Sequence, residues 1–224
     1  MIKNITNLGD SALYCDFGNI VNKEINSEVI KYYQNIKENN IEGINNLVPS
    51  YNKLIISFDL SITNFSKIKK ILENLSFNKD RKLLSKKIEI PICCDELFSL
   101  DIKRLEKILN LKREQIFDKF FSKEYFCYMT GFIAGMPFLG DLDINMRAKR
   151  LETPRIKVPK GSVGLTDQFT NIYTFESPGG WNIIGNTPIS VFDNKKEKKP
   201  NLISPGDIIV FRRIDLNQFK KYNV

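Results

Sequence analysis

The residues best suited to bind or react with a ligand lie between positions 131 and 207. The most distinctive segment is Ser177-Pro178-Gly179-Gly180-Trp181, in which the only tryptophan of the chain follows two glycines. Glycine lets a backbone approach a ligand closely, and an indole offers a flat apolar surface with one N–H donor. This segment therefore predicts one wall of a binding site.

Two basic residues upstream of that segment are candidate groups for binding an anionic ligand. Lys160 lies in the run Pro159-Lys160-Gly161-Ser162-Val163-Gly164, whose glycines, lysine and hydroxyl are the groups that a phosphate-binding turn uses. A lysine in an ordinary turn between strands explains the same run. Arg155 adds a guanidinium that can grip a carboxylate or a phosphate through two parallel hydrogen bonds.

Carboxylates are the candidates for acid–base work. Glu176 directly precedes the SPGGW segment and is favoured as a base by its position. Asp141 and Asp143 share a face if they lie in a strand, and in a turn they line a cleft or simply form the turn. The chain contains no histidine, which excludes Ser-His-Asp and Cys-His catalysis and histidine-bound zinc. Asp, Glu, Lys or Tyr must then do any acid–base work.

The cysteines give no sign of a metal or redox site. Cys15, Cys93, Cys94 and Cys127 all lie in apolar, strand-like stretches. The adjacent pair Cys93 and Cys94 has neither metal-ligand nor redox spacing, so we expect buried free thiols and no metal site. A reactive thiol at one of these two positions is the alternative.

Composition and charge limit the classes of function. A chain of 224 residues with 42% hydrophobic and 27% charged residues is typical of a globular protein. No apolar run approaches the roughly 20 residues that span a bilayer, and residues 1–4 do not resemble a signal peptide, so we expect a cytoplasmic protein with no membrane contact. The net charge of +8 is scattered. Its one dense group, residues 195–199, predicts a solvated loop or a site for an anionic partner, and no nucleic-acid binding.

Two differently patterned halves of the chain must position these residues. The first half alternates strands and helices in the order β-α-β-β-α-β, which is typical of a ferredoxin-like α+β unit. Its strands are expected at residues 11–17, 43–50, 53–58 and 88–92. Its helices are expected at residues 23–39 and from Phe65 onward, with Ser61 or Thr63 as the cap of the second helix.

The second half begins with a helical pattern over residues 95–121 and then changes to short β segments. These segments are expected at residues 126–130, 163–165, 172–175, 181–185 and 208–211, with turns rich in proline and glycine between them. Such spacing is typical of a compact β-barrel or sandwich. We therefore predict a ferredoxin-like α+β domain over residues 1–88 and a β-barrel domain with leading helices over residues 89–224.

Taken together, the motifs resemble a family that includes the B subunit of the ATP-dependent 5-oxoprolinase, the sporulation-kinase inhibitor KipI and allophanate hydrolase subunit 1. The same module forms part of the carboxyltransferase region of urea carboxylase. The resemblance covers nearly the whole chain and rests on short motifs in order, among them Gly9-Asp10-Ser11-Ala12-Leu13, Pro137-Phe138-Leu139-Gly140, Thr153-Pro154-Arg155, Gly161-Ser162-Val163-Gly164, Ser177-Pro178-Gly179-Gly180-Trp181 and Pro205-Gly206-Asp207.

The resemblance implies an α+β fold in which a smaller N-terminal domain precedes a cyclophilin-like β-barrel. It also implies a homologous second subunit as partner, of the type of the 5-oxoprolinase C subunit or allophanate hydrolase subunit 2, and a small-molecule amide substrate. The implied activity is the ATP-dependent opening of 5-oxoproline to glutamate, with ATP and Mg²⁺ bound by the complex. Inhibition of a histidine kinase, as in KipI, and a role related to urea carboxylase or allophanate hydrolase are the alternatives.

The implied chemistry assigns roles to particular residues. ATP-driven phosphorylation of an amide oxygen needs cations, for which Lys160 and Arg155 are available, and Asp143 or Glu176 would then orient water. We therefore expect Asp143, Glu176 and Lys160 to be catalytic. The expected substrate or nucleotide contacts are Arg155, Ser162, Tyr173, Ser177, Pro178, Gly179, Gly180, Trp181 and Asn182.

The chain departs from the family at several polar positions. The family often has histidine where Phe120 stands, glutamine near Phe169 and arginine where Asn186 stands. The glycines are retained better than these polar groups. This pattern favours a divergent substrate or a member that only binds.

Overall fold

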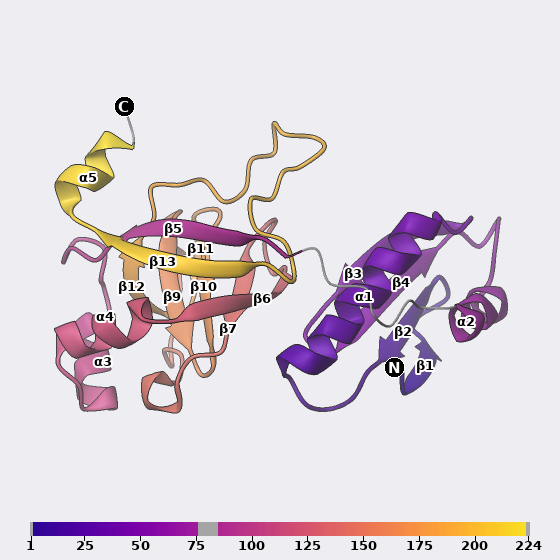
Figure 1. Cartoon of the computed structure of the whole chain (residues 1–224), viewed down its shortest axis with the longest axis horizontal. Coiled ribbons are helices and arrows are strands. Elements are labelled where there is room, and N and C mark those ends of the chain that lie inside the picture. The colour runs from indigo at the N-terminus through magenta and orange to yellow at the C-terminus, as the bar shows by residue number, and fades with distance from the viewer. Residues whose placement is uncertain (1, 76–84, 223–224) are drawn as a thin grey trace. The chain divides into compact units, whose positions relative to one another are not determined.

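The computed structural model describes residues 2–75 and 85–222 of the chain (Figure 1). The chain divides into two compact units, Met1–Leu84 and Ser85–Val224. No helix within the described ranges is both long and apolar enough to cross a membrane.

The first unit is a four-stranded antiparallel sheet with two helices packed on one face. Its elements in chain order are β1 (Asn4–Asn7), β2 (Ala12–Asp16), α1 (Lys23–Asn39), β3 (Ile44–Pro49), β4 (Lys53–Phe58) and α2 (Phe65–Asn74) (Figure 1). The strand order is β1-β2-β4-β3. Alternate residues of β2 and β4, such as Leu13 and Leu54, form one core with Val29 of α1 and Ile68 of α2.

Two expectations for this unit are wrong in detail. Residues 88–92 do not complete its sheet, because they pair in the second unit, and β1 forms the edge strand beside β2 instead. Alternating apolar residues predict a strand but not the sheet in which it pairs. The cap of α2 is Asn64, whose side-chain oxygen accepts a hydrogen bond from the N–H of Lys67 at 3.0 Å, rather than Ser61 or Thr63.

The second unit is built on a closed seven-stranded barrel, which confirms the predicted fold class. The strand order around the barrel is β10-β7-β6-β13-β5-β12-β9, and β8 and β11 form a separate two-stranded ribbon. The strands are β5 (Lys87–Cys93), β6 (Glu124–Thr130), β7 (Pro137–Gly140), β8 (Arg155–Val158), β9 (Ser162–Thr166), β10 (Phe169–Ile172), β11 (Ser177–Gly179), β12 (Asn182–Asn186) and β13 (Ile208–Ile214). The helices are α3 (Ile102–Leu109), α4 (Arg113–Phe121) and α5 (Leu216–Lys221), with a 3-10 turn at Ile144–Met146.

The inside of the barrel is filled by one apolar cluster. Every barrel strand contributes to it, for example Ile92 of β5 and Ile184 of β12. Helices α3 and α4 add Leu105 and Phe120 to the same cluster, and the Phe120 ring stacks on Phe211 with centroids 5.1 Å apart. The helices therefore close the core rather than form a separate layer.

The remaining differences from the sequence prediction concern short elements. The helical pattern over residues 95–121 resolves into α3 and α4, which separate at Asn110 with a φ of 52°. Strands β7, β8 and β11 were not predicted, since strands of three or four residues carry little alternation. The strand expected at residues 172–175 ends at Ile172. The predicted domain limit at residue 88 falls inside β5, all of whose residues pair with β13.

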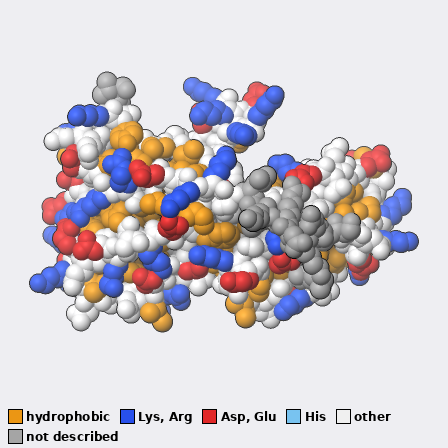
Figure 2. All heavy atoms as spheres, in the orientation of Figure 1, with side chains coloured by type: hydrophobic (Ala, Val, Ile, Leu, Met, Phe, Trp, Pro, Cys, Tyr) orange, Lys and Arg blue, Asp and Glu red, His pale blue; other side chains and the backbone are white. Residues whose placement is uncertain are grey.

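The dense lysine group lies on a loop that projects from the barrel between β12 and β13 (Figure 1). Residues 195–199 are all exposed, and Figure 2 shows basic side chains gathered on this projection. The turn is shaped by Asp193, whose carboxylate accepts a hydrogen bond from the N–H of Lys195 at 3.1 Å. This exposure agrees with the prediction of a solvated loop.

Candidate functional site

A row of residues on the outer face of the barrel lies beside Trp181 of the predicted binding segment. In the register of four adjacent strands, Phe138 of β7 lies beside Asn171 of β10, which lies beside Gly164 of β9, which in turn lies beside Ile183 of β12. Side chains alternate between the two faces of a strand. Because the neighbours of these residues, such as Ile184, fill the inside of the barrel, the row faces outward.

Gly164 makes room for larger side chains on this face. A Cβ atom at Gly164 would lie 2.9 Å from Asn171 Oδ1 and 3.0 Å from Trp181 Cβ. The half-buried Trp181 indole meets the Phe138 ring edge-on, with centroids 5.6 Å apart. The tryptophan of the SPGGW segment is therefore part of a packed aromatic surface.

The β8–β11 ribbon brings the rest of the SPGGW segment to the same place. Gly179 lies against Tyr173, and a Cβ atom added there would be 2.2 Å from the Tyr173 hydroxyl oxygen. Val158 of β8 and Met136 complete a small apolar cluster around the Tyr173 ring. We call Asp101, Arg155, Asn171, Tyr173, Gly179 and Trp181 together the Tyr173 cluster.

A buried ion pair anchors Arg155 in this cluster. Arg155 Nη2 donates a hydrogen bond to Asp101 Oδ1 at 2.6 Å, and Asp101 Oδ2 accepts from the Ile183 N–H at 2.7 Å. The Asp101 backbone N–H also donates to the Ile183 carbonyl at 3.0 Å. The Asp101 side chain is 5% exposed and that of Arg155 is 27% exposed. The Asp101 carboxylate is thus fixed by the backbone of β12 and holds the Arg155 guanidinium through its other oxygen.

Three buried polar atoms of this region have no hydrogen-bond partner among the described residues. They are Arg155 Nη1, Asn171 Oδ1 and Ser177 Oγ. Burial raises the pKa of Tyr173, and the neighbouring Asn171 amide and the Trp181 backbone partly offset that rise. Unpaired buried polar atoms are uncommon in folded proteins.

The turn that carries Lys160 is hydrogen-bonded to the backbone of Tyr173. The N–H of Gly161 donates to the Tyr173 carbonyl at 2.7 Å, and Gly161 has a φ of +82°. The amide of Asn186 donates to the Lys160 carbonyl at 2.9 Å. Ser162, the next residue of the turn, is buried. Lys160 therefore directly precedes the residue that binds the Tyr173 backbone, while the exposed Pro178 lies on the ribbon.

Asn182 and Gly180 fix the course of the chain beside the cluster. The Asn182 amide is fully buried and donates to the carbonyls of Leu165 at 3.0 Å and Lys149 at 3.1 Å. It also accepts a hydrogen bond from Arg104 of α3. The Gly180 carbonyl accepts from the Leu151 N–H at 2.7 Å. These contacts draw the basic segment around Lys149 against the start of β12.

The structure does not bring the two predicted carboxylate catalysts together. Glu176 is exposed and pairs with Lys157 at 3.0 Å on the ribbon surface. Asp143 pairs with Lys123 at 2.5 Å and follows the Gly140 end of β7. Gly140 lies opposite the first residue of β10, whereas Tyr173 follows its last. Asp143 is therefore at the far end of β10 from the Tyr173 cluster. Both assignments stay predictions.

The departures from the family pattern fall at different depths. Phe120 of α4 belongs to the apolar core of the barrel unit. The Phe169 ring meets the Tyr128 ring edge-on, with centroids 5.6 Å apart. Neither is part of the Tyr173 cluster. Asn186 is a buried neighbour of the Lys160 turn. The departure closest to the candidate site is therefore Asn186.

Sequence reasoning missed Asp101 and Asn171. Asp101 lies 54 residues before Arg155 in the chain, and it directly precedes a helix, where an aspartate is an ordinary helix-capping residue. Asn171 lies in a short strand with no motif around it. Only the folded register brings these two polar groups to the cluster.

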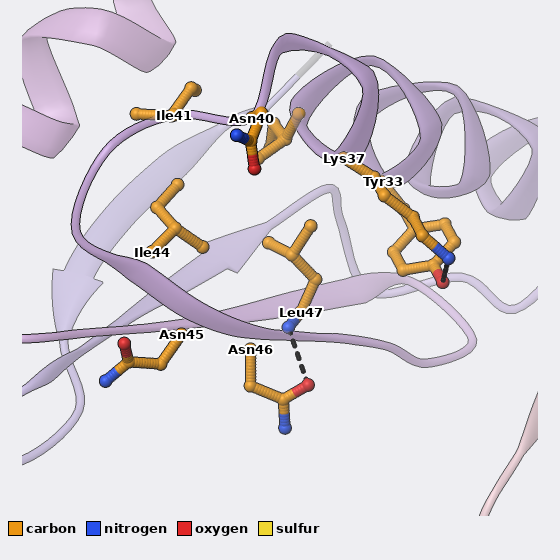
Figure 3. Close-up of a pocket in the computed structure, with 9 residues that line it drawn as sticks. Tyr33, Lys37, Asn40, Ile41, Ile44, Asn45, Asn46 and Leu47 are labelled. Carbon is orange, nitrogen blue, oxygen red and sulfur yellow. Dashed lines mark hydrogen bonds between the residues drawn. The ribbon is translucent and has the colours of Figure 1, made fainter. Parts of the chain in front are cut away.

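The described cavities lie elsewhere. One of about 250 Å³ lies between the end of α1 and β3, with Tyr33, Lys37 and Asn40 around an apolar floor (Figure 3). Another of about 430 Å³ lies where β5 and β13 end, and Cys93 and Cys94 are among its lining residues. Both thiols are buried, and burial raises the pKa of Cys94 to about 12. A raised pKa opposes formation of the reactive thiolate.

Comparison with known sequences identifies the family of the chain. Residues 3–203 match the model of the carboxyltransferase domain, subdomain C and D. The 5-oxoprolinase B subunit of Bacillus subtilis is 32% identical over 230 residues, which are 97% of this chain and 95% of that protein. The 5-oxoprolinase B subunit of Haemophilus influenzae is 40% identical over 124 residues, which are 55% of this chain and 58% of that protein.

Solved structures share the fold. The conserved uncharacterized protein PH0987 of Pyrococcus horikoshii is 33% identical, with a TM-score of 0.58, and the match covers 96% of this chain and all of that one (100%). The TTHA0988 structure is 27% identical, with a TM-score of 0.83 over 92% of this chain and 40% of that one. The Kluyveromyces lactis urea carboxylase, at 19% identity and a TM-score of 0.79, matches 97% of this chain and 22% of its own length. The chain therefore belongs to the family of the carboxyltransferase domain, subdomain C and D, together with the 5-oxoprolinase B subunits.

Proposed function

We propose that this chain is one subunit of an ATP-dependent amidohydrolase of the 5-oxoprolinase type, which opens 5-oxoproline to glutamate. The observation that carries the proposal is the 32% identity to the Bacillus subtilis 5-oxoprolinase B subunit over 97% of this chain and 95% of that protein. Three relatives carry the word subunit in their names, which supports a second subunit as partner. We expect that partner to be homologous and of the type of the 5-oxoprolinase C subunit.

The cluster supplies groups that suit this chemistry. An amide is a poor electrophile, and ATP supplies the phosphoryl group that activates its oxygen, so cations are needed to balance the added charge. Arg155 has an unpaired Nη1, and Lys160 directly precedes Gly161, whose N–H donates to the Tyr173 carbonyl. Mg²⁺ is commonly held by one or two carboxylates and the phosphate oxygens. We propose that the complex binds the nucleotide and its Mg²⁺, with Arg155 and Lys160 as this chain's contribution.

The predicted carboxylates differ in how well they fit this proposal. Glu176 directly precedes Ser177 and the β11 strand, so it lies on the ribbon that carries Gly179. Asp143 lies at the far end of β10 and is held by Lys123. We therefore favour Glu176 over Asp143 as the group that orients water.

The test is a reconstitution assay. The chain is co-expressed with candidate homologous partner subunits, and glutamate release from 5-oxoproline is measured with and without ATP. We expect release only when ATP and the partner are both present, and none from the chain alone. No release with any combination of partner subunits contradicts the proposal.

A second substrate in the same assay separates the urea-related alternative. The urea amidolyase of Saccharomyces cerevisiae is 21% identical over 91% of this chain, although the match spans only 13% of that protein. ATP consumption that depends on urea and not on 5-oxoproline would favour this alternative. Consumption that depends on 5-oxoproline favours the proposal.

A further inference from the structure

Asp101 is placed to orient Arg155, whose Nη1 group is buried without a hydrogen-bond partner among the described residues. One carboxylate oxygen binds Arg155 Nη2 at 2.6 Å and the other binds the Ile183 N–H at 2.7 Å. Both oxygens are therefore engaged, and the backbone of Asp101 is tied to Ile183 as well. A guanidinium has five N–H donors in a rigid planar fork, and the Nη1 group of Arg155 remains unpaired among the described residues.

The chain segment before Arg155 is basic. The segment before it is drawn against β12 by the hydrogen bonds of Asn182 to Lys149 and of Leu151 to Gly180. This segment carries Lys149 and Arg150, both exposed. Arg104 of α3 donates to the amide oxygen of the same Asn182. Arg155 is thus paired with Asp101, and the chain segment that precedes it carries two further exposed cations.

We propose that Asp101 is a positioning residue that holds the buried, unpaired Nη1 group of Arg155 in place for an oxyanion of the ligand, beside Tyr173 and Gly179. The inference rests on the proposed function, which offers two sources of such an oxyanion. One is the carboxylate of 5-oxoproline and the other is a phosphoryl group of ATP. Both are planar or tetrahedral oxyanions that a guanidinium fork binds through parallel hydrogen bonds.

Trp181 makes the proposal testable in the full-length chain. It is the only tryptophan and belongs to the Tyr173 cluster, so intrinsic tryptophan fluorescence reports on this site. The chain is titrated with 5-oxoproline, with 2-pyrrolidinone, which is the same ring without the carboxylate, and with inorganic phosphate. Saturable binding of 5-oxoproline without binding of 2-pyrrolidinone assigns the carboxylate as the bound group. Saturable binding of phosphate alone assigns the phosphoryl group.

Two conservative variants test the roles of the ion pair. Arg155→Lys keeps the charge but loses the fork, and Asp101→Asn keeps an acceptor for the Ile183 N–H but loses the charge that orients Arg155. We expect each to weaken oxyanion binding by about tenfold or more, as the loss of one charge-assisted hydrogen bond does. Arg212→Lys is the control, because Arg212 pairs with Glu89 on the exposed surface of β13 and its replacement leaves binding unchanged.

Further measurements distinguish a failure of this proposal from a loss of folding and from a failure of the proposed function. Thermal unfolding identifies any variant that loses its fold. If Asp101→Asn unfolds, Arg155→Lys still tests the ion pair, because it leaves Asp101 paired with a cation. Equal binding of 5-oxoproline and 2-pyrrolidinone, unchanged binding in Arg155→Lys, or no saturation by either oxyanion in the folded chain overturns the proposal. In the reconstituted complex, Asp101→Asn raises the KM for the ligand more than it lowers kcat. Wild-type kinetics in Asp101→Asn refute the positioning role of Asp101 but leave the proposed function standing. Oxyanion binding that depends on Arg155 but is not followed by hydrolysis contradicts the proposed function and leaves the positioning role standing.

Discussion

Gly179 is the position at which the smallest change should disturb the Tyr173 cluster most. A methyl group there would lie 2.2 Å from the Tyr173 hydroxyl oxygen and 2.8 Å from two atoms of its ring. The ring is held by its packing and has little room to retreat. Because overpacking of this kind typically costs about 1–3 kcal/mol, Gly179→Ala should lower the free energy of unfolding by that amount in chemical denaturation.

The neighbouring glycine provides the matched control. A methyl group at Gly180 would meet its closest atoms at 3.6 Å, which is an ordinary van der Waals contact. Gly180→Ala should therefore leave the free energy of unfolding nearly unchanged. Equal effects of the two substitutions would show that Gly179 is not sterically confined by Tyr173.

At the scale of single residues, the sequence predicts flexible and aromatic positions better than polar partnerships. The glycines and the tryptophan of the SPGGW segment stand out because their types are unusual in that spacing. Asp101 does not stand out, since its role depends on a partner 54 residues away. Glu176 directly precedes the segment, but sequence proximity does not reveal that it pairs with Lys157.

Among the elements, β3 shows how an open sheet edge is protected. It lies at the edge of the first unit's sheet. The Leu47 N–H donates a hydrogen bond to the Asn46 side-chain oxygen at 2.9 Å (Figure 3). Pro49 lies two residues further along the strand, so its backbone nitrogen points the same way as that of Leu47, and this nitrogen carries no hydrogen. Unpaired edge groups invite pairing with another chain. The double substitution Asn46→Ala with Pro49→Thr should therefore produce concentration-dependent association in sedimentation velocity.

Asn45→Ala is the control for the edge prediction. Asn45 is an exposed neighbouring amide of β3, and its removal frees no backbone donor bonded by Asn46. It should leave the sedimentation coefficient unchanged at all concentrations. Association of this control to the same extent, or a monomeric double variant, would contradict the assignment of Asn46 and Pro49 as edge-blocking residues.

The same strand-level view explains which elements the sequence could predict. The sequence predicts β4 at its observed limits. Leu54, Ile56 and Phe58 stand at alternate positions, and these are the buried residues of the strand. Residues 88–92 show the same alternation, yet they pair with β13, whose residues follow about 120 positions later. Local pattern fixes the type of an element, whereas the choice of partner depends on distant residues and on closure of the barrel.

At the scale of the whole molecule, the two units have separate cores. The cores of the sheet unit and of the barrel share no residue. All pairing partners of β5 lie within the second unit. We therefore expect residues 85–224 to fold alone into a barrel, with a cooperative thermal transition and dispersed amide signals in an NMR spectrum. An unfolded fragment would show that the barrel depends on residues 1–84.

A fragment that begins four residues later tests where the barrel starts. Lys86 donates its N–H to Asp207 at 2.9 Å and accepts from the Ile208 N–H at 2.8 Å, and Lys87 and Ile88 pair with Ile208 and Ile209. Residues 89–224 lack all of these contacts, and β13 then has an open end beside β5. This fragment should unfold at a lower temperature than residues 85–224, because buried backbone groups of β13 lose their partners. Equal melting temperatures would place the boundary at residue 88, as the sequence alone predicts. They would also show that the first residues of β5 add nothing to the stability of the barrel.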